Sequence, residues 1–197
     1  LPKGDLRVMR KEQREKKYHV ESMAILEAAC VWRTHHSYGV VVHSGQLIAN
    51  LAQTDFGNVT KENLTIETSS GHRLGVNMLK PKTATNDKPA PTIVFAHGGN
   101  GLKEKWDLYQ IEWARRGFVV FSFDLYGHGD SEILNNTEWL VNGRGLYDTV
   151  KYAATLPFVD KDQIAVSGQS RGGNTIHETI LLDNKAKKQL IKAVLYV

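Results

Sequence analysis

The 197-residue sequence lacks several features that would by themselves identify its structural class. Its single cysteine, Cys30, cannot form an internal disulfide and leaves no second thiol for a CxxC motif or a cysteine-rich metal site. The longest apolar run, 23–32, is interrupted by Glu27 and is well short of the ~20 residues that a membrane-spanning helix needs. No internal repeat or low-complexity linker divides the chain. These absences, together with 41% hydrophobic and 23% charged residues, predict one globular domain.

The sequence has an excess of positive charge only at its start. Residues 1–17 hold seven Lys or Arg against three Asp or Glu, which accounts for the whole net charge of +4. We therefore predict that 1–57 is a basic, partly helical N-terminal arm, with an amphipathic helix over 22–32. A solvated arm is the simplest interpretation: we predict no nucleic acid partner, and contact with an anionic membrane surface stays open. We expect a cytoplasmic protein, with a peripheral membrane role as the alternative.

Three histidines in the arm do not predict a metal site. His35, His36 and His43 are close in the sequence, but their spacing matches no metal-binding motif and no carboxylate supports them. We expect ordinary surface or partly buried histidines, and no metal.

From residue 58 onward, strand-like and helix-like segments alternate. Alternating apolar residues on both sides of the turn Ser69-Ser70-Gly71 predict an antiparallel hairpin over 64–79. The apolar runs and helical spacings that follow predict, in order, strand 92–96, a helix from 106 that Gly117 ends, strand 118–123, helix 145–156, strand 163–167, helix 171–182 and strand 191–197. This alternation predicts an α/β fold with a mostly parallel sheet and helices on both faces.

Two glycine-rich segments follow predicted strands, and one of them holds a candidate nucleophile. Gly168-Gln169-Ser170-Arg171-Gly172 lies between the strand at 163–167 and the helix from 171, and its glycines allow the chain to turn sharply at the serine. An enzyme that uses a serine hydroxyl must expose it beside donors for an oxyanion. The other segment, His97-Gly98-Gly99-Asn100-Gly101, follows strand 92–96, so both lie at the carboxyl ends of strands, where such sheets hold their sites. A glycine–serine loop between two core elements is the alternative interpretation.

Three motifs together resemble the α/β-hydrolase superfamily, over about residues 60–197. In chain order they are Phe95-Ala96-His97-Gly98-Gly99, Phe123-Asp124-Leu125-Tyr126-Gly127-His128-Gly129-Asp130-Ser131 and Gly168-Gln169-Ser170-Arg171-Gly172-Gly173. The segment 156–164 is similar to the linker in the dienelactone-hydrolase-like and prolyl-oligopeptidase-like branches. The resemblance implies an α/β-hydrolase fold and a serine acyl hydrolase that acts on small acyl esters and needs no cofactor.

The resemblance also implies roles for single residues. Ser170 would be the nucleophile, the N–H of Arg171 one oxyanion-hole donor, and the N–H of Gly99 the second donor, with Gly98 as the alternative. The remaining histidines and acids of the three motifs and of the helix from 171 receive no catalytic part: His97, His128, His177, Asp124 and Asp130.

The triad acid and histidine are not expected within this sequence. In the family they follow the nucleophile on later strands, and only 27 residues follow Ser170. We therefore expect 58–197 to be the N-terminal portion of an α/β-hydrolase domain, truncated after the sixth strand, with a C-terminal half of the same domain as its partner. A carboxylesterase that forms an acyl-enzyme on Ser170 is the leading function. A non-catalytic binding or scaffold protein with a hydrolase fold, and a serine peptidase of the prolyl-oligopeptidase type, are the alternatives.

Overall fold

The structure, a computed structural model, describes residues 58–135 and 139–197. The predictions made for the arm at 1–57, including Cys30 and the three histidines, lie outside the described residues.

The predicted hairpin is present and is longer than its apolar pattern suggested. β1 (Val59–Glu67) pairs antiparallel with β2 (Arg73–Pro81), with Leu64 opposite Val76. Gly71 adopts a φ of 78° in the turn between them, a left-handed conformation that favours glycine. β1 begins at residue 59 because hydrogen bonds to β2 extend the pairing over residues whose side chains are mostly exposed.

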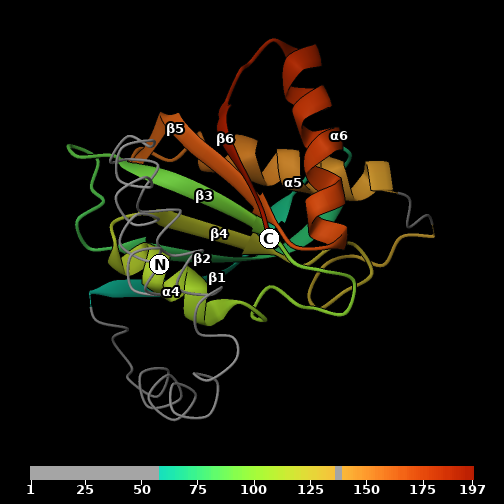
Figure 1. Cartoon of the computed structure of the whole chain (residues 1–197), viewed down its shortest axis with the longest axis horizontal. Helices are drawn as coiled ribbons and strands as arrows, with labels where there is room; N and C mark the ends of the chain where they lie inside the picture. The colour runs from blue at the N-terminus through green and yellow to red at the C-terminus, as the bar shows by residue number, and fades with distance from the viewer. Residues whose placement is uncertain (1–57, 136–138) are drawn as a thin grey trace, which may run out of the picture. The chain divides into compact units, whose positions relative to one another are not determined.

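In the part of the chain that the structure describes, six strands form one sheet in the order β1-β2-β4-β3-β5-β6 (Figure 1). β3 (Ala90–Ala96), β4 (Val119–Phe123), β5 (Val159–Gly168) and β6 (Ile191–Tyr196) run parallel to one another, and β2 joins β4 antiparallel. Every residue of β4 is buried, as expected for a strand covered on both faces. The α/β fold with a mostly parallel sheet is confirmed.

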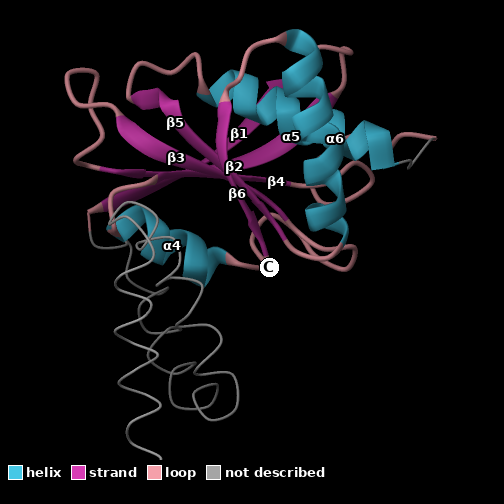
Figure 2. Cartoon of the chain, turned by 45° about the horizontal axis from the view of Figure 1, so that its top comes forward, coloured by secondary structure: helices cyan, strands magenta, loops and turns pink. Residues whose placement is uncertain are grey.

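Helices cover both faces of this sheet (Figure 2). α4 (Asp107–Arg115) lies on one face, and α5 (Trp139–Ala153) and α6 (Arg171–Ala186) lie together on the other. Gly117, with a φ of 97°, donates its N–H to the Ala114 carbonyl at 3.0 Å and ends α4 as predicted. The apolar core on the α5 and α6 face consists of fully buried side chains such as Phe121, Phe123, Leu146, Val150 and Ile176.

The starts of α5 and β5 also differ from the sequence prediction. α5 begins at Trp139 rather than near Gly145. β5 begins at Val159 rather than Gln163, so most of the segment 156–164 is strand and not linker. The early part of β5 has the polar residues 160–163, which bulge between the pairs Val159–Ala90 and Ile164–Thr92, and so lacks the apolar pattern of a buried strand.

Asp183 connects the end of α6 to the start of β6. Its buried carboxylate accepts the backbone N–H groups of Leu190 and Ile191 at 3.2 and 3.1 Å, and the hydroxyl of Tyr147 at 3.4 Å. Because β6 pairs with β5, this contact helps to set where β6 enters the sheet.

Within residues 58–135 and 139–197 no helix is long and apolar enough to cross a bilayer.

Candidate active site at the carboxyl edge of the sheet

Ser170 lies at the turn between β5 and α6, and the residue is exposed. Its backbone has a φ of 52° and a ψ of −114°, a conformation that an L-residue rarely adopts. Such strain costs of order 1–3 kcal/mol and persists only where the surrounding structure imposes it. The Ser170 carbonyl accepts the N–H of Asn174 at 3.1 Å, so the strained residue is also the one that starts the helix.

The glycines around Ser170 are required by close backbone packing. A Cβ atom on Gly168 would lie 2.5 Å from the carbonyl carbon and oxygen of Gly172. A Cβ atom on Gly172 would lie 2.1 Å from the Ala96 carbonyl oxygen and 2.6 Å from the His97 carbonyl oxygen. The first turn of α6 therefore packs backbone to backbone against the ends of β5 and β3, which holds the serine in its turn.

The second glycine-rich segment lies directly beside the serine turn. Gln169 donates its backbone N–H to the Ala96 carbonyl at 3.2 Å. A Cβ atom on Gly98 would lie 2.2 Å from the side-chain oxygen of Gln169, and one on Gly99 would lie 3.6 Å from Cδ of Arg171. The structure thus brings the predicted nucleophile and all three candidate donor residues to one place at the carboxyl edge of the sheet.

His97 fixes the peptide that joins Gly98 to Gly99. The Leu125 N–H donates to Nε2 of this fully buried ring at 3.0 Å, so Nε2 is the acceptor and Nδ1 carries the proton. Nδ1–H donates to the Gly98 carbonyl at 2.6 Å, and burial lowers the pKa of His97, which keeps the ring neutral. Because a trans peptide is planar, a fixed Gly98 carbonyl also fixes the opposite direction of the Gly99 N–H. Both nitrogens of His97 are engaged, so this ring is not available as a general base.

An ion cluster around the buried Lys103 and Asp124 side chains connects the loop after β3 to the loop after β4. The Lys103 ammonium lies 2.9 Å from Oδ2 of Asp124, 2.6 Å from Oδ2 of Asp130 and 3.1 Å from Oε1 of Glu104, and only 5% of the Lys103 side chain is exposed. Burial alone would raise the pKa of Asp124, but the Lys103 ammonium and the backbone N–H groups of Asp130 and Lys103 outweigh it and lower that pKa. Burial opposes the charge on Lys103, yet the surrounding carboxylates raise its pKa. Lys103 was not predicted, because no local motif marks a lysine whose partners, Asp124 and Asp130, are 21 and 27 residues away in the chain.

His177 is exposed on α6, with its ring 5.5 Å from that of Tyr196 on β6. The Ser170 hydroxyl makes no hydrogen bond to any residue of the described ranges, so no general base is hydrogen-bonded to it there. In the same part of the chain no group of three or more His, Cys, Asp or Glu residues could hold a metal ion.

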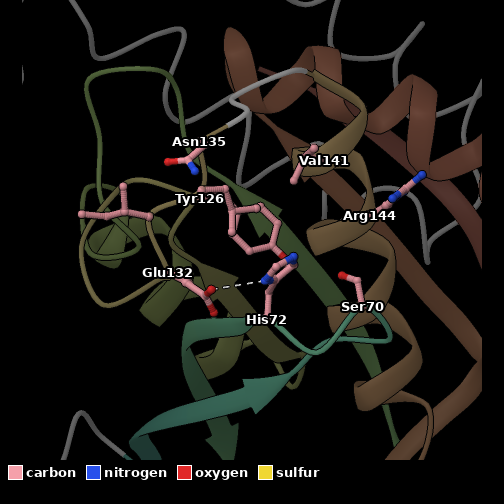
Figure 3. Close-up of a pocket in the computed structure, with 9 residues that line it drawn as sticks. Ser70, His72, Tyr126, Glu132, Asn135, Val141 and Arg144 are labelled. Atoms are coloured by element: carbon pink, nitrogen blue, oxygen red, sulfur yellow. Dashed lines mark hydrogen bonds and ion pairs between the residues drawn. The ribbon is translucent and has the colours of Figure 1, made fainter.

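A separate pocket of about 450 Å³ lies beside the hairpin turn and the start of α5 (Figure 3). His72 and Glu132 meet in it at 3.2 Å, and the backbone N–H of Arg73 donates to the other Glu132 oxygen at 3.0 Å, which lowers the pKa of Glu132. Its lining residues are Ser70, His72, Tyr126, Glu132, Ile133, Leu134, Asn135, Val141 and Arg144. Ser170 is not among them, so this pocket is distinct from the serine turn.

Comparison with protein families identifies the family of this chain. Residues 70–194 match the model of the X-Pro dipeptidyl-peptidase family, S15, which is more than half of the sequence. The chain belongs to the S15 family. This family lies within the α/β-hydrolase superfamily, so the resemblance inferred from the three motifs is confirmed.

This S15 chain is similar to other proteins over part of their length. The uncharacterized protein YfhR of Salmonella typhi is 27% identical over 118 residues, which cover 58% of this chain and 39% of YfhR. The hypothetical protein PA2218 from Pseudomonas aeruginosa is 26% identical in structure comparison, with a TM-score of 0.60, and the match covers 71% of this chain and 42% of PA2218. A bacterial heroin esterase has the same fold at 24% identity and a TM-score of 0.58, over 74% of this chain and 46% of the esterase. The chain therefore spans less than half the length of each of these three relatives.

Proposed function

We propose that this S15 chain is part of a serine acyl hydrolase that forms an acyl-enzyme on Ser170, with carboxylic esters as its substrates. The observation that carries the proposal is that Ser170 is exposed and has a strained backbone, with a φ of 52°, at the turn from β5 into α6. A strand-to-helix turn of this kind lifts a serine hydroxyl above the sheet edge, where a substrate carbonyl can reach it. Membership of the S15 family supports hydrolytic chemistry at this turn.

In the proposed reaction the Ser170 oxygen forms a bond to the substrate carbonyl carbon while its proton passes to a general base. The carbonyl oxygen becomes an oxyanion, which the backbone N–H groups of Arg171 and Gly99 would bind. Collapse expels the alcohol, which takes the proton, and water then attacks the acyl-enzyme to release the acid and restore the serine. One such donor typically contributes about 3 kcal/mol to the transition state.

We propose that the base and the rest of the sheet lie in a further segment of the protein. No histidine of the described ranges is hydrogen-bonded to Ser170, and the chain spans less than half the length of YfhR and of PA2218. β6 pairs with β5 alone among the described strands, and it exposes 38% of Val194 and 52% of Tyr196. Such an apolar edge needs a pairing partner, and a C-terminal half of the same domain would supply it.

A peptidase is the second candidate, and the S15 match favours it. The family is named for X-Pro dipeptidyl-peptidases, and cleavage after proline uses the same acyl-enzyme at a serine. Amides have a poorer leaving group than esters, so a peptidase must also protonate the departing amine. The ratio of kcat/KM for p-nitrophenyl acetate to that for an Xaa-Pro-p-nitroanilide would separate the two: the esterase proposal expects the acetate to be strongly preferred.

The test of the proposal uses the full-length protein and its Ser170→Ala variant. We expect Ser170→Ala to lose p-nitrophenyl acetate hydrolysis by about 10³-fold or more. Ser167→Ala is the matched control, because Ser167 is three residues away, 1% exposed, and its hydroxyl has no partner in the described part of the chain. Activity that survives in Ser170→Ala would refute the proposal. A full-length protein with no hydrolase activity on either substrate would instead favour a binding or scaffold role.

A further inference from the structure

A second histidine, His128, contacts Gly99, and the proposed reaction does not use it as an acid or a base. Nε2 of His128 lies 2.9 Å from the Gly99 carbonyl oxygen, and Nδ1 lies 3.2 Å from the Tyr126 carbonyl oxygen. A neutral imidazole has one N–H, and we assign it to the shorter contact, so that His128 donates to Gly99. The His128 ring also packs against His97, with ring centroids 5.2 Å apart.

The turn that carries His128 is fixed at several points. Gly127 and Gly129 on its two sides have φ values of 78° and 48°, and the His128 N–H donates to the Leu125 carbonyl at 2.9 Å. The Asp124 carboxylate accepts the backbone N–H of Asp130 at 3.0 Å, and a Cβ atom on Gly129 would lie 2.1 Å from that carboxylate. The buried Lys103 cluster then joins this turn to the loop that contains Gly99. The turn that carries His128 is therefore held in place while the His128 ring contacts Gly99.

We propose that His128 is a positioning residue for the oxyanion hole, which holds Gly99 so that its N–H faces the reacting acyl oxygen. Gly99 lacks a Cβ atom and can rotate freely about its backbone bonds, so one fixed neighbour is not enough to orient it. His97 fixes the peptide before Gly99, and His128 fixes the peptide after it. With both peptides held, the donor is in place before the negative charge develops, which is the condition for strong stabilisation. The proposal rests on the proposed acyl transfer at Ser170.

The test compares His128→Phe and His128→Gln in the full-length protein. Phenylalanine keeps an aromatic ring beside His97 but cannot donate to Gly99, whereas the glutamine amide can place a donor close to the position of Nε2. We expect His128→Phe to lower kcat for p-nitrophenyl acetate roughly 10- to 100-fold with KM changed less than about twofold, since the lost interaction acts in the transition state. His128→Gln should recover most of kcat. If His128→Phe does not fold, His128→Asn replaces it, because its shorter amide cannot reach Gly99.

A second readout does not depend on activity. Amide hydrogen exchange of the peptide over residues 97–102 should be faster in His128→Phe than in the wild type and should return to the wild-type rate in His128→Gln. Equal exchange in His128→Phe and the wild type would overturn the inference, and so would a wild-type kcat in His128→Phe or an equal loss of kcat in both variants. A wild-type protein with no hydrolysis would overturn the proposed function, while the exchange result would still decide whether His128 holds the loop.

Discussion

Replacement of Gly172 by alanine tests whether α6 packs against the ends of β3 and β5 as closely as the structure shows. The new Cβ atom would lie 2.1 Å from the Ala96 carbonyl oxygen, 2.5 Å from its carbon and 2.6 Å from the His97 carbonyl oxygen. All three are backbone atoms, so the contact cannot be relieved by a side-chain rotation. The helix would have to move away from the sheet.

The expected cost follows from these contacts. Overpacking of a well-packed region costs typically 1–3 kcal/mol, and contacts with fixed backbone place Gly172→Ala at the upper end, about 3 kcal/mol. Gly173→Ala is the matched control on the same helix, because its Cβ atom would lie 3.4 Å from the nearest atom, the Gly168 carbonyl oxygen. Alanine is also favoured over glycine within a helix by up to about 1 kcal/mol, so Gly173→Ala should be neutral or stabilising.

Urea unfolding of the full-length protein, followed by tryptophan fluorescence, measures both variants. With a slope of about 2–3 kcal/mol per M, Gly172→Ala should lower the midpoint by about 1 M and Gly173→Ala should not lower it. Equal midpoints for Gly172→Ala and the wild type, or an equal loss in the two variants, would refute the close approach of α6 and with it the origin of the strain at Ser170.

Three other substitutions test separate parts of the structure. Asp124→Asn should lower the free energy of unfolding at pH 7 by about 3 kcal/mol, because it leaves the buried Lys103 without its closest buried partner. Since the folded-state pKa of Asp124 is lowered, the stability that this carboxylate contributes is present above pH 4 and is lost as the pH falls through the folded-state pKa. The free energy of unfolding, measured from pH 7 to pH 2, should therefore decline less in Asp124→Asn than in the wild type. The same decline in both proteins would contradict this. Ser170→Gly should be about 1 kcal/mol more stable than Ser170→Ala in thermal unfolding, because glycine tolerates the positive φ, and equal stability would argue against strain at this position. Asp183→Asn should lower stability by about 1–2 kcal/mol, because an amide oxygen cannot replace both acceptors at the start of β6, and a neutral effect in urea unfolding would contradict that role.

Much of the fold could be predicted because apolar runs and turn residues agree with the elements that form. β4 is the clearest case, since four of its five residues are apolar and all five are buried. The start of β5 could not be predicted in this way. Its pairing with β3 is interrupted at the polar residues 160–163, which form a bulge, and there the Asp160 carboxylate accepts the Asp162 N–H at 2.9 Å and supports a local turn.

The sequence predicted which residues form the candidate site, but not the contacts that hold them in place. The GxSxG spacing and the glycine segment after β3 are local patterns, so Ser170 and the candidate donors were visible in the sequence. The contacts that hold them join residues far apart in the chain, such as Lys103 with Asp124 and His128 with Gly99. No local pattern encodes such pairs, and only the folded loops bring them together.

Covalent labelling tests the central claim most directly. The full-length protein is treated with a fluorophosphonate, and the modified residue is located by mass spectrometry of the tryptic peptide 162–171, whose fragment ions must separate Ser167 from Ser170. We predict one adduct, on Ser170, that is absent after Ser170→Ala. An adduct on another serine, or none on a folded wild-type protein, would contradict the assignment of Ser170 as the nucleophile.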